Sequence, residues 1–205
     1  MNKMKIEIWS DIACPYCYIG KRKLDKALES LTFTEEIEVI WRSYNLDPDL
    51  PKGNYGKSFY EYLSEKQGFT TDQVKEDFSI IQSLAKEVGL KFNPEKIIVT
   101  NTMDALRLVK LAGKYAVATQ AEEELFKAYF TDGEDISNKD VLSTLAAKVG
   151  IPTEDLIRCI DSFEYSDNIK NDIFRADNDL NLEFIPFYLI NNKHIIQGSV
   201  SIEEY

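Results

Sequence analysis

Two cysteines, Cys14 and Cys17, are separated only by Pro15 and Tyr16. Cysteines at this spacing can close a small disulfide ring and reopen it by thiol–disulfide exchange, which proceeds through a mixed disulfide with the substrate. The same spacing also occurs in half of many zinc sites, where thiolates coordinate the metal. The pair therefore indicates either redox catalysis or metal binding.

The segment around the cysteines predicts that they lie at the start of a helix. A strand-like alternation over about residues 4–9 precedes them, and apolar residues at helical spacing follow them as far as Leu31. Pro15 suits the first turn of such a helix, because its missing N–H would have had no partner there. Unpaired N–H groups at a helix N-terminus favour a thiolate. We therefore predict that Cys14 is the attacking nucleophile and that Cys17 resolves the mixed disulfide.

The third cysteine, Cys159, and the single histidine, His194, would have to complete a zinc site. Both lie far from the dithiol pair in the sequence and lack the short pair-and-pair spacing of zinc modules. We therefore predict a redox role and no metal. Cys159 lies in an apolar helical stripe and is predicted to be a small core residue. His194 is predicted to be a surface or packing residue rather than a general base.

Length, charge and composition narrow the class of protein. The chain has 205 residues, 44% hydrophobic residues and a net charge of −11, which suits one large domain or a domain with an insertion. The acidity argues against nucleic acid and anionic membrane surfaces as partners, and no stretch approaches the roughly 20 apolar residues of a membrane span. The first residues lack the apolar core of a secretory signal. We therefore expect a cytoplasmic protein.

Hydrophobic periodicity predicts strands towards both ends of the chain and helices between them. A second strand is expected at residues 37–43, and the hairpin signal at residues 187–197 predicts two more. Residues 45–56 are rich in turn formers and read as a connecting loop. Apolar stripes, caps and glycines predict further helices over about residues 70–89, 101–113, 116–130, 137–150, 153–163 and 165–179.

This order of elements predicts an α/β sheet domain interrupted by a helical insertion. The sheet domain is assigned to residues 1–45 and 165–205, and the loop and helical insertion are assigned to residues 46–164. Residues 201–204 have the form of a capping box, yet the chain ends at Tyr205. We therefore expect a closing helix that is cut short.

Four segments together resemble the DsbA-like oxidoreductases of the FrnE type, which are related to 2-hydroxychromene-2-carboxylate isomerases and kappa-class glutathione transferases. They are residues 8–22, which include the dithiol, and residues 101–108, 125–133 and 185–198. The resemblance covers nearly the whole chain in order. It implies a thioredoxin-like fold with a large all-helical insertion, and dithiol–disulfide exchange with protein or small-molecule substrates. It also implies that the redox-active disulfide works without a bound cofactor.

The resemblance also assigns roles beyond the two cysteines. It implies a cis bond between Ile185 and Pro186 that faces the sulfurs, with the Ile185 backbone free to pair with an extended substrate. Relatives carry a strand carboxylate six residues before the first cysteine, and Ile8 stands at that position here. Asp11 is near in sequence and could replace this proton acceptor for Cys17, although an aspartate before a helix is commonly a turn or capping residue.

Two other function classes compete with the dithiol oxidoreductase. In the glutathione-dependent isomerases and transferases of this fold, the thiol of glutathione does the chemistry and a serine commonly replaces the first cysteine, so the retained Cys14 argues against them. Glutathione is nevertheless a candidate co-substrate, because the helix start at Asn101 and Thr102 could bind its carboxylate; plain helix capping is the alternative for Asn101. The other class is a non-enzymatic binding module, in which both cysteines would be replaceable.

Aromatic residues of the loop and the insertion have two interpretations. Tyr55, Phe59, Tyr60 and Tyr62 could line a substrate groove, but aromatics near helical spacing more often belong to a core. We favour the core. The sequence does not predict an oligomeric state.

Overall fold

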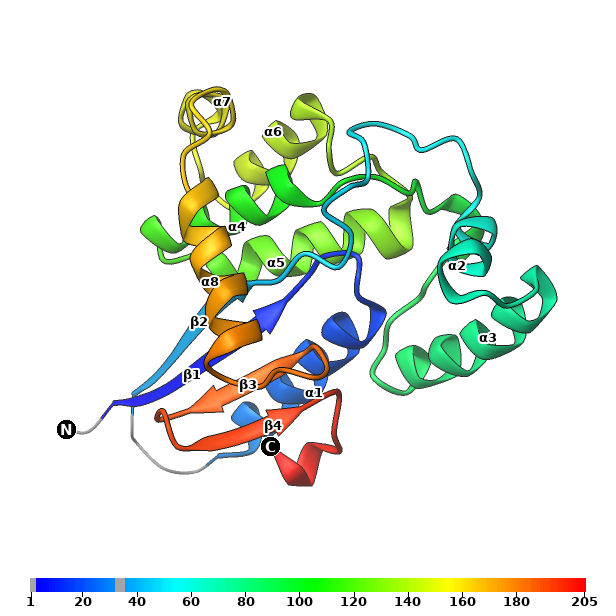
Figure 1. The fold of residues 1–205 in the computed structure, drawn as a ribbon. Coiled ribbons are helices and arrows are strands. Elements are labelled where there is room, and N and C mark those ends of the chain that lie inside the picture. Colours follow the sequence, from blue (N-terminus) through cyan, green and yellow to red (C-terminus); the bar gives the residue numbers. More distant parts are fainter. Residues whose placement is uncertain (1–2, 32–35) are drawn as a thin grey trace.

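The computed structural model describes residues 3–31 and 36–205 and contains a mixed four-stranded sheet (Figure 1). The strand order is β2-β1-β3-β4; β1 and β2 are parallel, and the other neighbours are antiparallel. The strands are β1 (Met4–Ser10), β2 (Ile37–Ser43), β3 (Phe187–Ile190) and β4 (His194–Gln197). This is the predicted set of strands, with β1 one residue longer than expected.

Helix α1 connects the two parallel strands, α2 to α7 lie between β2 and the last helix, and α8 leads into the C-terminal hairpin (Figure 1). Helices α2 and α3 form a pair on one flank, apart from the group formed by α4 to α7. The arrangement is the predicted α/β thioredoxin-like fold with an all-helical insertion. The helices are α1 (Pro15–Ser30), α2 (Phe59–Gln67), α3 (Thr71–Glu87), α4 (Met103–Lys114), α5 (Ala118–Lys127), α6 (Lys139–Lys148), α7 (Thr153–Asp161) and α8 (Ser166–Asn178). Within the described residues, none of them is long and apolar enough to cross a membrane.

Several boundaries differ from the predictions. The helix expected to reach residue 130 is α-helical only to Lys127 and continues as a π-turn over Ala128–Asp132. Helix α6 is capped by Asn138, whose Oδ1 accepts the N–H of Asp140 at 2.8 Å. Ser137, the first residue of the helix predicted over about residues 137–150, instead donates its hydroxyl to Asp135 and accepts the N–H of Gly53. Asn and Ser both cap helices well, so the sequence alone does not choose between neighbours.

The C-terminal capping box forms, but only a short turn follows it. The Ser201 N–H donates to Glu204 Oε2 at 2.9 Å, and residues Ile202–Glu204 make one 3₁₀ turn. The Tyr205 hydroxyl donates to the Tyr188 hydroxyl at 2.8 Å, which ties this turn to strand β3.

Charged contacts fasten α8 to one face of the sheet. Glu7 of β1 is fully buried, and its Oε1 accepts from Arg42 at 2.6 Å and from Arg175 at 2.8 Å. Burial would raise the pKa of Glu7, but the two arginines outweigh it and lower this pKa to about 2. The Trp9 indole also donates to the Asp172 carbonyl at 2.9 Å.

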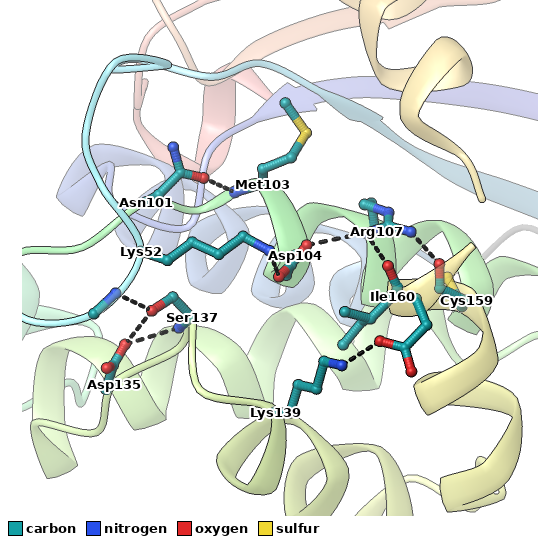
Figure 2. Close-up of polar contacts among 12 residues, drawn as sticks. Lys52, Asn101, Met103, Asp104, Arg107, Asp135, Ser137, Lys139, Cys159 and Ile160 are labelled. Carbon is teal, nitrogen blue, oxygen red and sulfur yellow. Dashed lines mark hydrogen bonds and ion pairs between the residues drawn. The ribbon is translucent and has the colours of Figure 1, made fainter. Parts of the chain in front are cut away.

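A buried arginine ties the helices of the insertion together (Figure 2). Arg107 of α4 is 1% exposed and donates to the carboxylate of Asp104 and to the carbonyls of Cys159 and Ile160 in α7. Lys52 reaches the other Asp104 oxygen at 2.5 Å, so the 45–56 loop is anchored to the same cluster. The charges are paired and hydrogen-bonded, as buried charges must be.

Candidate active site

The dithiol sits at the start of α1, which begins at Pro15. Cys14 is the residue before the first turn, and its carbonyl accepts the N–H of Cys17 at 3.1 Å. Both thiols are free, and the two residues are only 4% and 1% exposed. Tyr16, between them, is 41% exposed. Tyr16 is therefore the solvent-exposed residue of the motif, while both cysteines are buried.

The two sulfurs have different surroundings. Burial raises the pKa of the Cys17 thiol well above its usual range, the neighbouring Cys14 adds to the shift, and the backbone of Asp11 opposes it. Cys14 Sγ instead lies 3.8 Å from the carbonyl oxygen of Ile185. Cys17 is thus kept as a thiol in contact with Cys14.

The peptide bond between Ile185 and Pro186 is cis, as the resemblance implies. Pro186 packs against α1 at Gly20, where a β-carbon would lie 2.9 Å from Pro186 Cγ and 2.5 Å from the Tyr188 hydroxyl. Only a residue without a side chain allows this close approach. Gly20 therefore determines how near the cis peptide can lie to the helix that carries the dithiol.

Asp11 is a buried connector between the dithiol loop and the 45–56 loop. Its carboxylate accepts the N–H of Leu46 at 2.7 Å and that of Ala13 at 3.3 Å. Burial raises the pKa of Asp11, and the hydrogen bond from Leu46 opposes this shift. Its backbone carbonyl accepts the Cys14 N–H at 3.0 Å. The residue makes the local turn and also places a carboxyl group beside the dithiol.

The side chain of Asn101 is occupied by hydrogen bonds to other parts of the protein. Its Oδ1 accepts the Met103 N–H at 2.9 Å (Figure 2), and its Nδ2 donates to the carbonyls of Pro48 at 3.2 Å and Leu50 at 2.8 Å. Asn101 thus satisfies the first N–H of α4, whose N-cap residue is Thr102, and holds the 45–56 loop. Thr102 is buried beside Asp11 and opposes the rise in the pKa of that carboxyl group.

A cavity of about 490 Å³, here called the chamber, opens beside Cys14. The dithiol motif, the 45–56 loop, α2, α3 and Tyr129 enclose it. Phe59 and Tyr62 are among its wall residues, whereas Tyr55 and Tyr60 are not. The expected core role therefore holds for Tyr60, which is 7% exposed, while Phe59 serves both the core and the cavity wall.

Residues 5–205 match the DSBA-like thioredoxin domain. The chain belongs to this family. The uncharacterised protein YwbO of Bacillus subtilis (strain 168) is 22% identical over 199 residues, which are 95% of this chain and 90% of YwbO. A probable DsbA oxidoreductase from Streptomyces coelicolor has a similar crystal structure, with a TM-score of 0.90 and 27% identity over 98% of this chain and 86% of that one.

A more distant structure with a similar fold is that of the cytosolic disulfide reductase DsbM from Pseudomonas aeruginosa with glutathione. Its TM-score is 0.65 and its identity is 14%, over 94% of this chain and 89% of that one. At this identity the likeness concerns the fold alone. The family is one of probable disulfide oxidoreductases and isomerases.

One buried acid near the dithiol of this DSBA-like chain was not predicted from the sequence. Glu122 of α5 is 1% exposed; burial raises its pKa to about 8, Lys21 opposes the shift, and Asp11 adds to it. Lys21 lies one helical turn after Cys17 on α1. Glu122 stands in an ordinary amphipathic stripe, so no local pattern marks it.

The residues considered for a metal site lie apart. Cys159 is buried in α7, where burial raises its pKa to about 11, and His194 is exposed at the start of β4. Across residues 3–31 and 36–205, no three His, Cys, Asp or Glu side chains are grouped as metal ligands.

Proposed function

We propose that the protein is a thiol–disulfide oxidoreductase in which Cys14 is the nucleophile and Cys17 is the resolving thiol. The observation that carries this proposal is the pair of free, adjacent thiols at the start of α1, with the carbonyl of Ile185 3.8 Å from Cys14 Sγ. Cys14 stands directly before the first turn of α1, the more N-terminal position of the pair, and the attacking species in such exchange is a thiolate. A protein or small-molecule disulfide is the substrate when the dithiol is reduced.

The reaction begins when the Cys14 thiolate attacks one sulfur of a substrate disulfide, and the other substrate sulfur leaves as a thiolate. Cys17 then loses its proton to the buried Asp11 carboxylate and attacks Cys14. The mixed disulfide breaks, the second substrate thiolate leaves, and the Cys14–Cys17 disulfide forms. The protein dithiol is oxidised by two electrons and the substrate disulfide is reduced to two thiols.

The cis peptide gives an extended substrate a place to bind. The Ile185 carbonyl faces Cys14 and is an acceptor for a substrate N–H, and Pro186 has no N–H of its own. Tyr16 is exposed at the motif and supplies an apolar contact for the substrate.

The test is a redox titration. The protein is equilibrated in graded ratios of reduced and oxidised glutathione, and separately of dithiothreitol; thiols are then trapped by alkylation and counted by mass. We expect Cys14 and Cys17 to oxidise together with one two-electron midpoint. Cys14→Ser should abolish the transition, and Cys159→Ser, the matched control at the buried third cysteine, should leave the midpoint unchanged.

The same titration separates the alternatives. Glutathione attached to Cys14 alone, with no internal disulfide, would favour a glutathione-dependent isomerase or transferase. A protein whose two cysteines never pair under any ratio would contradict the oxidoreductase and favour a non-enzymatic module.

A further inference from the structure

We propose that the chamber beside Cys14 binds the organic part of a neutral, largely apolar thiol or disulfide that carries a hydrogen-bond acceptor. The inference rests on the proposed function, because the ligand is the substrate of the same sulfur. It adds a substrate class: small neutral aromatic or aliphatic compounds are preferred over anionic thiols such as glutathione.

The size and walls of the chamber fit such a ligand. A volume of about 490 Å³ lies within the roughly 300–1,000 Å³ of small-molecule pockets. Phe59 and Phe78 form part of the wall and are 4% and 2% exposed, and Ile81 adds an aliphatic side chain. Aromatic walls of this kind favour an apolar body that removes their surface from water.

Three wall residues have a buried polar atom without a hydrogen-bond partner among the described residues. These atoms are the Asn45 side-chain amide nitrogen and the hydroxyls of Thr100 and Thr102, and the residues are 8%, 1% and 3% exposed. Asn45 already uses its amide oxygen to accept the Asp47 N–H at 3.1 Å. A buried donor without a partner is costly, so a ligand oxygen that accepts from these groups would be stabilised.

The charges around the chamber disfavour an anion. Among its described wall residues, Lys66 is the single cationic side chain. Its Nζ is already engaged, at 3.0 Å from Asp47 Oδ2 and 3.1 Å from the Leu46 carbonyl oxygen. The other charged groups of the wall are the carboxylates of Asp11 and Asp47. A carboxylate of the ligand would therefore be buried without a free cationic partner, which is unfavourable.

Cys14 is one of the wall residues of the chamber, so a ligand bound there lies beside the reactive sulfur. With the oxidised protein, a bound thiolate attacks Cys14 Sγ, the Cys14–Cys17 bond breaks, and Cys17 leaves as a thiolate that takes up a proton. A second thiolate attacks the mixed disulfide, forms the ligand disulfide and releases the Cys14 thiolate. The ligand thiols are oxidised, and the protein disulfide is reduced.

The probes for the test differ only in charge. They are para-(mercaptomethyl)benzamide, which is neutral, and para-(mercaptomethyl)benzoate, which is anionic; glutathione and 2-mercaptoethanol serve as references. Reduction of the oxidised protein is followed by stopped-flow Trp fluorescence at equal thiolate concentrations. We expect the benzamide to react at least about tenfold faster than the benzoate, with a rate that saturates with concentration.

Variants locate this preference in the chamber. Ile81→Trp fills the cavity and should lower the benzamide rate to that of 2-mercaptoethanol. Leu84→Trp is its matched control, because Leu84 lies on the same helix and is partly buried but is not a wall residue. Thr100→Val keeps the shape, removes the hydroxyl and should weaken the benzamide preference; it decides the outcome if Ile81→Trp does not fold.

The outcomes separate this inference from the proposed function. Equal rates for the two aromatic probes would overturn the inference, and so would a benzamide preference that both chamber variants leave unchanged. In either case a dithiothreitol midpoint for Cys14 and Cys17 would still support the oxidoreductase. If no Cys14–Cys17 disulfide forms in dithiothreitol buffers, the proposed function fails and this inference fails with it.

Discussion

Replacing Glu122 with Gln should remove a large part of the pH dependence of stability. Glu122 is 1% exposed, its Oε2 has no hydrogen-bond partner among the described residues, and its pKa is raised from 4.5 to about 8. Burial is the main cause, and Asp11 adds to it, while Lys21 and Lys110 oppose the shift. The carboxyl group is therefore mostly protonated in the folded protein at neutral pH.

The sign and size of the effect follow from proton linkage. Between pH 4.5 and about 8 the folded protein retains a proton on Glu122 that the unfolded chain has released, so the free energy of unfolding falls as pH rises through this window. The difference between the two pKa values corresponds to a loss of about 5 kcal/mol. Gln has nearly the same shape and does not titrate, so Glu122→Gln should lack this loss and should exceed the wild type in stability at pH 9.

Urea unfolding of the reduced protein, followed by far-ultraviolet circular dichroism from pH 5 to pH 9, measures this difference. Glu124→Gln is the matched control, because Glu124 lies on the same helix with 32% of its side chain exposed. Its profile should stay within about 0.5 kcal/mol of the wild type. If the profile of Glu122→Gln runs parallel to that of the wild type at every pH, Glu122 is ionised in the folded state and the reasoning is wrong.

Three further substitutions test the contacts around the sheet and the insertion. Glu7→Gln should lower the free energy of unfolding by roughly 2 kcal/mol at pH 7 and by less at pH 3. The reason is that the stabilisation from Glu7 is present above pH 4.5 and disappears as the pH falls towards 2. Equal losses in urea unfolding at the two pH values would contradict this reasoning. Gly20→Ala places a methyl group 2.5 Å from the Tyr188 hydroxyl and should cost roughly 1–3 kcal/mol, with slower dithiol exchange; an unchanged thermal midpoint would contradict the close approach. Arg107→Leu takes the buried cation from Asp104 Oδ1, leaving that carboxylate only the half-exposed Lys52, and leaves the carbonyls of Cys159 and Ile160 without their donor; it should cost roughly 3–5 kcal/mol in urea unfolding. Arg158→Leu, with 61% of its side chain exposed, should change little; equal losses would argue against the buried network.

Local rules were sufficient for the elements that carry the dithiol. The spacing of apolar residues predicted β1 and α1, and a proline in the first turn located the helix start. The helix predicted over about residues 70–89 is also present and begins with a capping box of Thr70 and Gln73, which depends only on groups three residues apart. The cis bond at Pro186 is different: about 5–6% of X–Pro bonds in folded proteins are cis, so the local sequence favoured trans and only the resemblance implied cis.

The chamber and Glu122 could not be predicted, because both depend on tertiary packing. The chamber is assembled from the dithiol motif, one loop, two helices and Tyr129, which are separated by up to a hundred residues or more in the chain. Nothing at residue 122 distinguishes a buried glutamate from an exposed one, since its neighbours Glu123 and Glu124 are only partly buried. Whether a carboxyl group is buried depends on which other elements pack over it. Hydrophobic periodicity describes only one helix at a time.

Two separate parts of the chain form the surroundings of Cys14. The sheet part of the chain supplies the sulfurs and the cis peptide, whereas the 45–56 loop, α2 and α3 supply most of the chamber wall. Under the proposed function, electron transfer would depend on the first set of residues and the choice of substrate on the second. Substitutions at Ile81 or Thr100 should therefore change which thiol reacts fastest. Substitutions of the residues around Cys17 should instead change the equilibrium between the dithiol and the disulfide.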